Sequence, residues 1–193
     1  MKRSLLAIVI GAGLLGGCVR VRFEPETKQQ QTDASALQSK DMRSQWAARL
    51  QKETTGLKLR STKTLVDSVT VQYLRYGDLV AERWRAGNQG QPQPMTEADV
   101  RAMVAKGTET QEPLFRAYEE MFEYALEQLK LSREVDDSTV ALLTNYGNHL
   151  YDTYSAVFFP TGAVEQYENK LYQLGQNGRD LSEELDRVIR VYR

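Results

Sequence analysis

The single histidine of the chain, His149, is the first side chain to consider for catalysis or metal binding. A di-iron helical bundle needs a Glu-x-x-His motif on each of two helices, but Tyr146 stands where that glutamate would be. Asp152 lies within reach of His149 on one helix, whereas Ser155 is six residues away and points to a different face. We therefore expect His149 to flank an apolar seam, where it packs and reaches solvent. We expect no metal and no other cofactor.

Four glutamates that lie close together in sequence are the next group that could do chemistry: Glu119, Glu120, Glu123 and Glu127. A glycosidase needs two carboxylates held across a sugar-binding cleft. On a helix these four lie largely opposite the apolar side, which predicts a solvated acidic face. A hydrolase remains an alternative if one of them faces another acid across a cleft.

Aromatic residues are concentrated in the segment before Pro160. Tyrosine and phenylalanine suit protein interfaces and sugar-stacking clefts, and they also suit a helical core whose hydroxyls reach the rim. The predicted partner surface is drawn from this segment and consists of Tyr146, Tyr151, Phe158 and Phe159. The Phe158-Phe159 pair is the best candidate for an exposed apolar loop.

Charge and cysteine content narrow the classes of function. The chain has 25 Lys and Arg against 26 Asp and Glu, which offers no broad basic surface for nucleic acid. Cys18 is the only cysteine, so no internal disulfide can form. An exported domain without disulfides must be held together by its apolar core.

The N-terminus has the pattern of a secretory signal: a basic start, an apolar run over residues 5–15, then two glycines and Cys18. The apolar run is too short for a spanning helix, which needs about 20 apolar residues. The sequence therefore predicts export and cleavage of residues 1–17.

The segment Leu15-Gly16-Gly17-Cys18 resembles the lipobox of bacterial lipoproteins. This resemblance implies diacylglycerol on the Cys18 thiol, cleavage before Cys18 and acylation of the new amino group. Two or more acyl chains anchor a protein stably. Val19 stands where an aspartate would signal inner-membrane retention, so the resemblance implies the periplasmic face of the outer membrane in a Gram-negative host.

Beyond a polar tether over residues 18–32, the apolar pattern is helical. Residues 61–86 carry a stripe with steps of three and four, although 68–76 is rich enough in β-branched and aromatic residues to suit a strand. Thr96 and Asp99 resemble a capping box that opens a short helix, and Pro113 suits the first turn of the next one. Helices are also predicted near 33–55, 113–130, 138–159, 164–174 and 180–192.

Two glycine positions carry structural predictions. Gly147 lies on the most regular seam, where it indicates close approach of a neighbouring helix. The glycines over residues 175–178 indicate the end of one helix, with Asp180 and Glu183 capping the next.

The expected fold is all-α: a compact bundle of six or seven helices over residues 33–193, behind the lipidated tether. The expected function is a non-catalytic scaffold or accessory subunit that binds an envelope protein. A module that binds cell-wall or surface polysaccharide through tyrosine platforms is the alternative, and a polysaccharide hydrolase is a weaker one.

Overall fold

A computed structural model describes residues 28–89, 93–109 and 111–192 of the chain. The lipobox residues Leu15, Gly16, Gly17 and Cys18 lie outside these ranges. The described residues form six helices and no strands, as predicted for an all-α fold. The helices are α1 (Lys28–Leu50), α2 (Thr55–Asn88), α3 (Glu97–Thr108), α4 (Glu112–Leu131), α5 (Asp137–Phe158) and α6 (Val164–Ile189).

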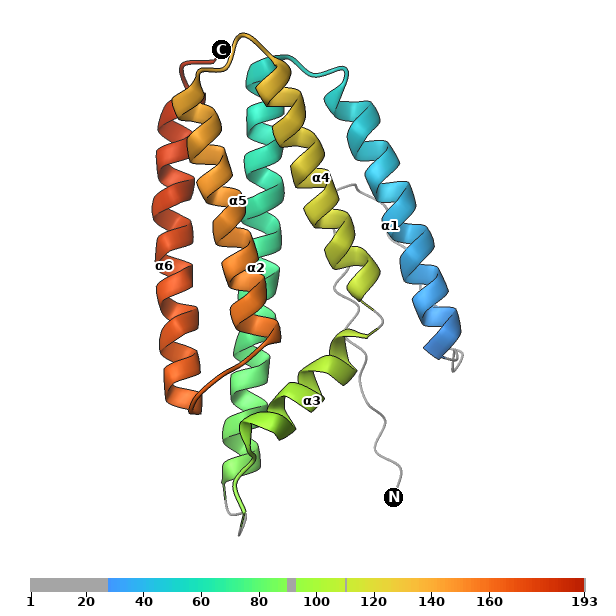
Figure 1. Cartoon of the computed structure of the whole chain (residues 1–193), viewed down its shortest axis with the longest axis vertical. Coiled ribbons are helices and arrows are strands. Elements are labelled where there is room, and N and C mark those ends of the chain that lie inside the picture. Colours follow the sequence, from blue (N-terminus) through green and yellow to red (C-terminus); the bar gives the residue numbers. More distant parts are fainter. Residues whose placement is uncertain (1–27, 90–92, 110, 193) are drawn as a thin grey trace.

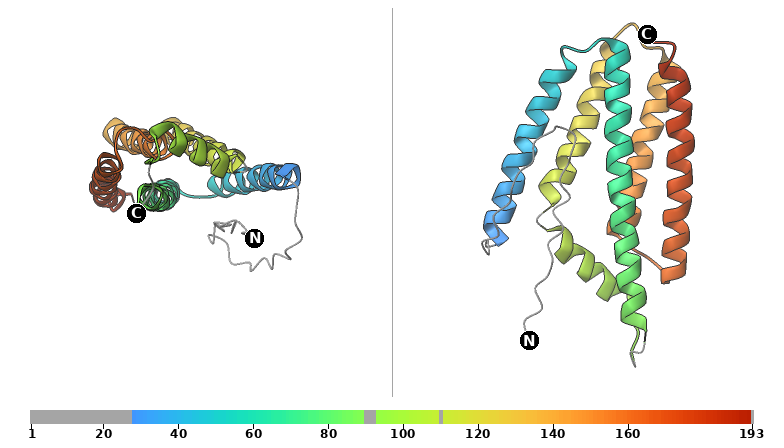
Figure 2. Two further views of the ribbon diagram at one scale, coloured as in Figure 1. Left: turned by 90° about the horizontal axis from the view of Figure 1, so that it is seen from below. Right: turned by 180° about the vertical axis from the view of Figure 1, so that it is seen from behind.

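The bundle is built around α2, which has 34 residues and packs along α4, α5 and α6. Five of the helices run roughly alongside one another, and the short α3 crosses one end (Figure 1). α1 lies at one edge of the bundle and packs mainly on α4 (Figure 2). The start of α1, the end of α2 and the α5–α6 loop are all at the lower end in Figure 1.

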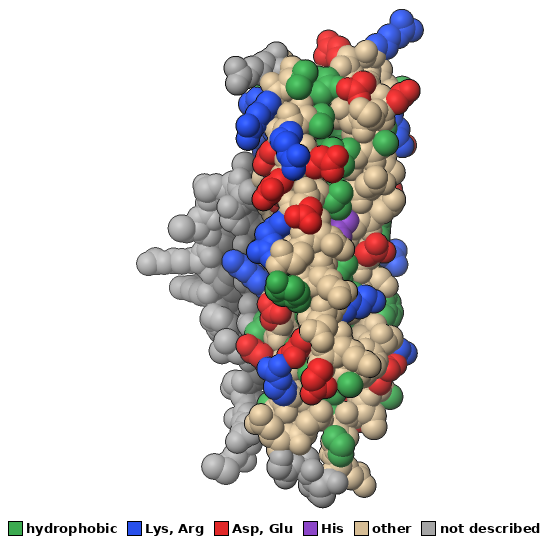
Figure 3. Space-filling view, turned by 90° about the vertical axis from the view of Figure 1, so that its left-hand side faces the viewer, with side chains coloured by type: hydrophobic (Ala, Val, Ile, Leu, Met, Phe, Trp, Pro, Cys, Tyr) green, Lys and Arg blue, Asp and Glu red, His purple; other side chains and the backbone are tan. Residues whose placement is uncertain are grey.

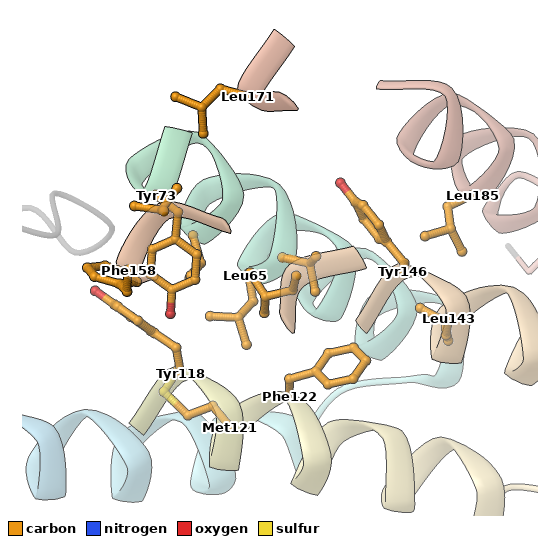
Figure 4. Packing of buried hydrophobic residues seen from close by; sticks show 14 of the residues in the cluster. Leu65, Tyr73, Tyr118, Met121, Phe122, Leu143, Tyr146, Phe158, Leu171 and Leu185 are labelled. Atoms are coloured by element: carbon orange, nitrogen blue, oxygen red, sulfur yellow. The ribbon is translucent and has the colours of Figure 1, made fainter. Parts of the chain in front are cut away.

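The predicted stripe on α2 is the centre of the core. Leu65, Val69, Tyr73 and Val80 are each at most 3% exposed, so the segment that suited a strand is helical. Side chains of α4, α5 and α6 meet this stripe (Figure 4). Burial of these apolar side chains is the main force that holds the helices together.

Local signals fix several helix ends. The Thr96 capping box is confirmed: the Asp99 amide donates to Thr96 Oγ1 and the Thr96 amide donates to Asp99 Oδ2. Pro113 lies in the first turn of α4, as predicted. The cap of α5 is Asp136, whose carboxylate accepts from the Thr139 amide at 2.8 Å.

Several predicted boundaries are wrong. α1 ends at Leu50 rather than near residue 55, and α2 already begins at Thr55 rather than near residue 61. α1 begins at Lys28, inside the segment predicted to be tether, where lysine and glutamines favour a helix. α6 runs unbroken from Val164 to Ile189, so residues 175–178 do not end a helix. Packing between helices outweighs glycine's weak helix propensity there. A Cβ on residue 178 would lie 2.8 Å from His149 Nε2, so the glycine allows α6 to approach α5 closely.

Candidate functional site

Two of the four aromatic residues predicted for a partner surface are buried, so that part of the prediction is wrong. Tyr146 is 1% exposed, and its hydroxyl donates to the Asp67 carboxylate on α2. Phe158 is 7% exposed and stacks on Tyr76 with ring centroids 5.4 Å apart. Both face the core because the helical period carries their positions to the side of α5 that packs on α2 (Figure 4).

Tyr151 is only half-buried and has a partner within the protein. Its hydroxyl donates to Glu123 Oε1 at 3.1 Å. Burial and the nearby Glu123 carboxylate raise the pKa of Tyr151 to about 12. Tyr151 is therefore a neutral hydrogen-bond donor that links α5 to α4, and its outer edge alone is available to a partner.

Phe159 is the predicted surface residue that the structure leaves open. It is 59% exposed and follows the last residue of α5. One edge of its ring meets Tyr154, with centroids 6.4 Å apart and the planes at 72°. The rest of the ring faces away from the core.

The loop that carries Phe159 is held in place by α3. Arg101 Nε donates to the Pro160 carbonyl at 3.1 Å, and the Gly162 amide donates to Glu97 Oε2 at 2.9 Å. Glu97 and Arg101 also form an ion pair with each other at 2.5 Å. Gly162 has φ of +82°, a conformation that favours glycine. The exposed ring is therefore presented on an anchored loop, and we call residues 159–163 the Phe159 loop.

Sequence reasoning missed Glu97 and Arg101 as parts of this site. They precede the loop by about sixty residues, and the only signal they gave was that of a charged helix start. The link between α3 and the loop follows from how α3 crosses the end of the bundle, which no local pattern specifies.

The acidic run on α4 lies at the surface rather than in a cleft. Glu120 pairs with Arg43 of α1, and Glu123 accepts from Tyr151. Burial and the neighbouring Glu123 raise the pKa of Glu119. None of the four glutamates lines either of the two described grooves. The positions of the four glutamates therefore fit the predicted solvated face. None of them faces another acid across either described groove.

His149 is more buried than predicted. It flanks the seam of α5 as expected, but it is 6% exposed, and little of it shows at the surface (Figure 3). Its Nε2 has no hydrogen-bond partner in the described part of the chain and lies against Gly178 of α6. Burial lowers the pKa of His149, and the Asp152 carboxylate partly opposes that shift.

A shallow polar groove of about 380 Å³ runs over His149. Amides and carboxylates of α5 and α6 line it, and tyrosines do not: the lining residues are Asn145, Asn148, His149, Asp152, Asn177, Asp180 and Leu181. The stacking platforms that a polysaccharide module would need are therefore missing from this groove.

A second groove is apolar and lies where α1, α2 and α4 meet. Its volume is about 300 Å³. The apolar lining consists of Met42, Trp46, Leu57, Leu65, Tyr118 and Met121, and the polar lining of Gln45, Arg49, Arg60, Ser61 and Thr64. Met42 and Trp46 are partly buried and pack against the core. The sequence could not show that α1 stands far enough from α2 to leave this space.

Two further properties concern the described residues only. They contain no group of three or more His, Cys, Asp or Glu side chains placed to hold a metal ion. No described helix combines the length and apolar character that crossing a membrane requires.

Comparison with known proteins leaves the chain without an assigned family. No family model, no curated protein and no solved structure matches it.

Proposed function

We propose that this protein is a membrane-tethered, non-catalytic binding module that holds another protein of the cell envelope. The lipobox resemblance at Leu15–Cys18 supports the tether and a place on the periplasmic face of the outer membrane. The Phe159 loop is the proposed docking surface. A scaffold or accessory role follows from these two parts together.

The observation that carries this proposal is an exposed aromatic ring on an anchored loop. Burying an exposed phenylalanine contributes about 1.5–3 kcal/mol, enough to anchor a small interface. Because Arg101 and Glu97 already hold the loop, a partner would not need to order it on binding. Phenylalanine and arginine are both enriched at protein interfaces, and Arg101 contacts the residue that follows Phe159.

The position of the loop also supports an envelope partner. The α5–α6 loop lies at the same end of the bundle as the start of α1 (Figure 1). A chain held through Cys18 would be tethered from the N-terminal side of α1. The docking surface would then be at the tethered end of the domain, within reach of a partner in or close to the membrane.

We expect Phe159→Asp to weaken partner binding without unfolding the protein. The test is crosslinking in living cells, followed by purification of the tagged chain and mass spectrometry. Wild type is expected to enrich one envelope protein, and Phe159→Asp to reduce its recovery by about tenfold, the effect of 1.4 kcal/mol. The substitution places a charge in the proposed contact, and within the fold it removes the edge contact of Phe159 with partly buried Tyr154.

Two control variants accompany this test. Tyr172→Asp alters an aromatic residue of similar exposure, 67%, on α6 away from the loop, and should retain the partner. Cys18→Ala should lose it through mislocalisation. If all four chains enrich the same proteins, the Phe159 loop is not the docking surface. If Phe159→Asp still enriches the partner but less of the variant is recovered in the membrane fraction, the loop contacts lipid instead.

A further inference from the structure

The apolar groove between α1 and α2 shares no residue with the Phe159 loop. Residues of α1, α2 and α4 line this groove, and Figure 2 (right) shows the ribbon of α4 behind and between those of α1 and α2. The base of the groove is apolar because Tyr118 and Met121, both almost fully buried, face it from α4. Trp46 closes one side and is fixed there, since its indole N–H donates to the Met121 carbonyl at 3.0 Å. The groove is therefore a formed space with an apolar base and one side fixed by the Trp46 hydrogen bond.

The size of the groove limits what can enter it. A helix with its side chains is about 10–12 Å wide, which is too wide for a space of about 300 Å³ enclosed by three helices. Small-molecule sites occupy about 300–1,000 Å³, so this groove is at the lower end of that range. A slender apolar occupant, such as one hydrocarbon chain, matches both its volume and its lining.

The charges at the groove specify the polar end of the occupant. Arg49 is already neutralised, because its Nε contacts Glu53 Oε1 at 2.6 Å and its Nη2 donates to Ser61. Arg60 also lines the groove, is exposed, and forms no ion pair within the described part of the chain. The groove thus has one cation left to pair, and a guanidinium binds a carboxylate through two parallel hydrogen bonds.

We propose that this groove binds one fatty acid, with its carboxylate on Arg60 and its hydrocarbon chain along Trp46, Leu65 and Met121. The driving force is removal of the chain from water, and Arg60 sets its direction. This site is separate from the Phe159 loop, which involves α3, α5 and α6 instead.

The test is calorimetric titration of the full chain carrying Cys18→Ser, stripped of co-purified lipid. The ligands are the sodium salts of octanoic, decanoic and dodecanoic acid, below their micelle concentrations, with dodecanol as the uncharged probe. Each buried methylene contributes about 0.8 kcal/mol, so affinity should rise about fourfold for every added carbon. Dodecanoate should bind more tightly than dodecanol.

Three variants separate the parts of this proposal. Thr64→Phe places a ring in the groove from an exposed position and should abolish binding of every ligand. Arg60→Gln should weaken dodecanoate roughly tenfold and leave dodecanol unchanged. Arg75→Gln removes an exposed cation elsewhere on α2 and should change nothing. Thermal unfolding of each variant checks that the fold is retained.

Several outcomes would overturn the proposal. One is that no ligand binds, and another is that affinity does not depend on the length of the hydrocarbon chain. Either result would indicate that the groove accepts a side chain of a protein partner instead. Another is unchanged binding in Thr64→Phe, which would place the ligand elsewhere. Equal affinity for dodecanol and dodecanoate in wild type would remove the assigned role of Arg60.

Discussion

Replacing Gly147 with alanine is expected to lower the free energy of unfolding by roughly 1–2 kcal/mol, although alanine is the better helix former. A Cβ at this position of α5 would overlap Cε1 and Cζ of the Phe122 ring on α4. Phe122 is 3% exposed, so its ring could move only against other side chains of the core. Overpacking of a core typically costs about 1–3 kcal/mol, which exceeds the gain in helix propensity of about 0.5–1 kcal/mol.

Urea unfolding of a matched pair of variants measures this effect. Gly175→Ala is the control, because its Cβ would meet only Leu74 Cδ1 at an ordinary 3.6 Å. This variant should be more stable than wild type by about 0.5–1 kcal/mol. Adding Phe122→Leu to Gly147→Ala should cost less than the sum of the two single changes. Equal effects of alanine at 147 and 175 would contradict the close approach of α4 and α5.

Replacing His149 with glutamine is expected to remove a pH-dependent loss of stability between pH 7 and 5. Burial holds the pKa of His149 below its usual 6.5 in the folded protein. The groups that face it are Asp152 on its own helix, Asp180 and Asn177 across the polar groove, and Thr70 of α2 near Gly178. Of these groups, only the Asp152 carboxylate raises the pKa of His149, and this effect is smaller than the lowering caused by burial.

The sign of this effect follows from proton binding. The unfolded chain takes up a proton on His149 near pH 6.5, whereas the folded protein does so only at a lower pH. Acid therefore favours the unfolded state across that interval, with a slope of up to about 1.4 kcal/mol per pH unit. Above pH 7 both states are neutral and the effect vanishes.

The measurement is the free energy of unfolding of wild type and His149→Gln at pH 8, 7, 6 and 5. The difference between the two proteins isolates the histidine, because carboxyl groups such as Glu119 titrate in both. Wild type should lose stability relative to the variant as the pH falls below 7. A constant difference across the series would mean that His149 titrates alike in the folded and unfolded chain.

Much of the helical framework was predictable because it depends on local pattern. The steps of three and four on α2 placed Leu65, Val69 and Tyr73 in the core. The Thr96 capping box and Pro113 gave two helix starts, since caps act within one turn. Gly147 was interpreted correctly as a close approach, although the sequence could not identify Phe122 as the neighbour.

The errors arose where packing between distant segments decided the outcome. Glycines at 175 and 178 indicated a helix end, yet α6 continues there and packs on both α2 and α5. Leu74 of α2 is the neighbour of Gly175, and His149 of α5 is the neighbour of Gly178. Tyr146 was assigned to the surface, but its hydroxyl reaches Asp67, seventy-nine residues earlier in the chain. Tyrosine suits a rim and a core equally well, so composition could not distinguish the two.

The candidate site was predictable only in part for the same reason. The phenylalanine pair before Pro160 pointed to an exposed loop, and Phe159 occupies it. The residues that anchor that loop, Glu97 and Arg101, and the space between α1 and α2 depend on how α3 and α1 are placed. No spacing within one helix carries that information.

The claim on which the proposed function depends is that the domain works while held at a membrane through Cys18. The most direct measurement is mass spectrometry of the N-terminal peptide of the tagged protein, extracted from membranes of its own host. We predict a mature chain that begins at Cys18 and carries diacylglycerol on its thiol and an acyl group on its amino group. A mature chain that begins at another residue, or an unmodified Cys18 thiol, would contradict it.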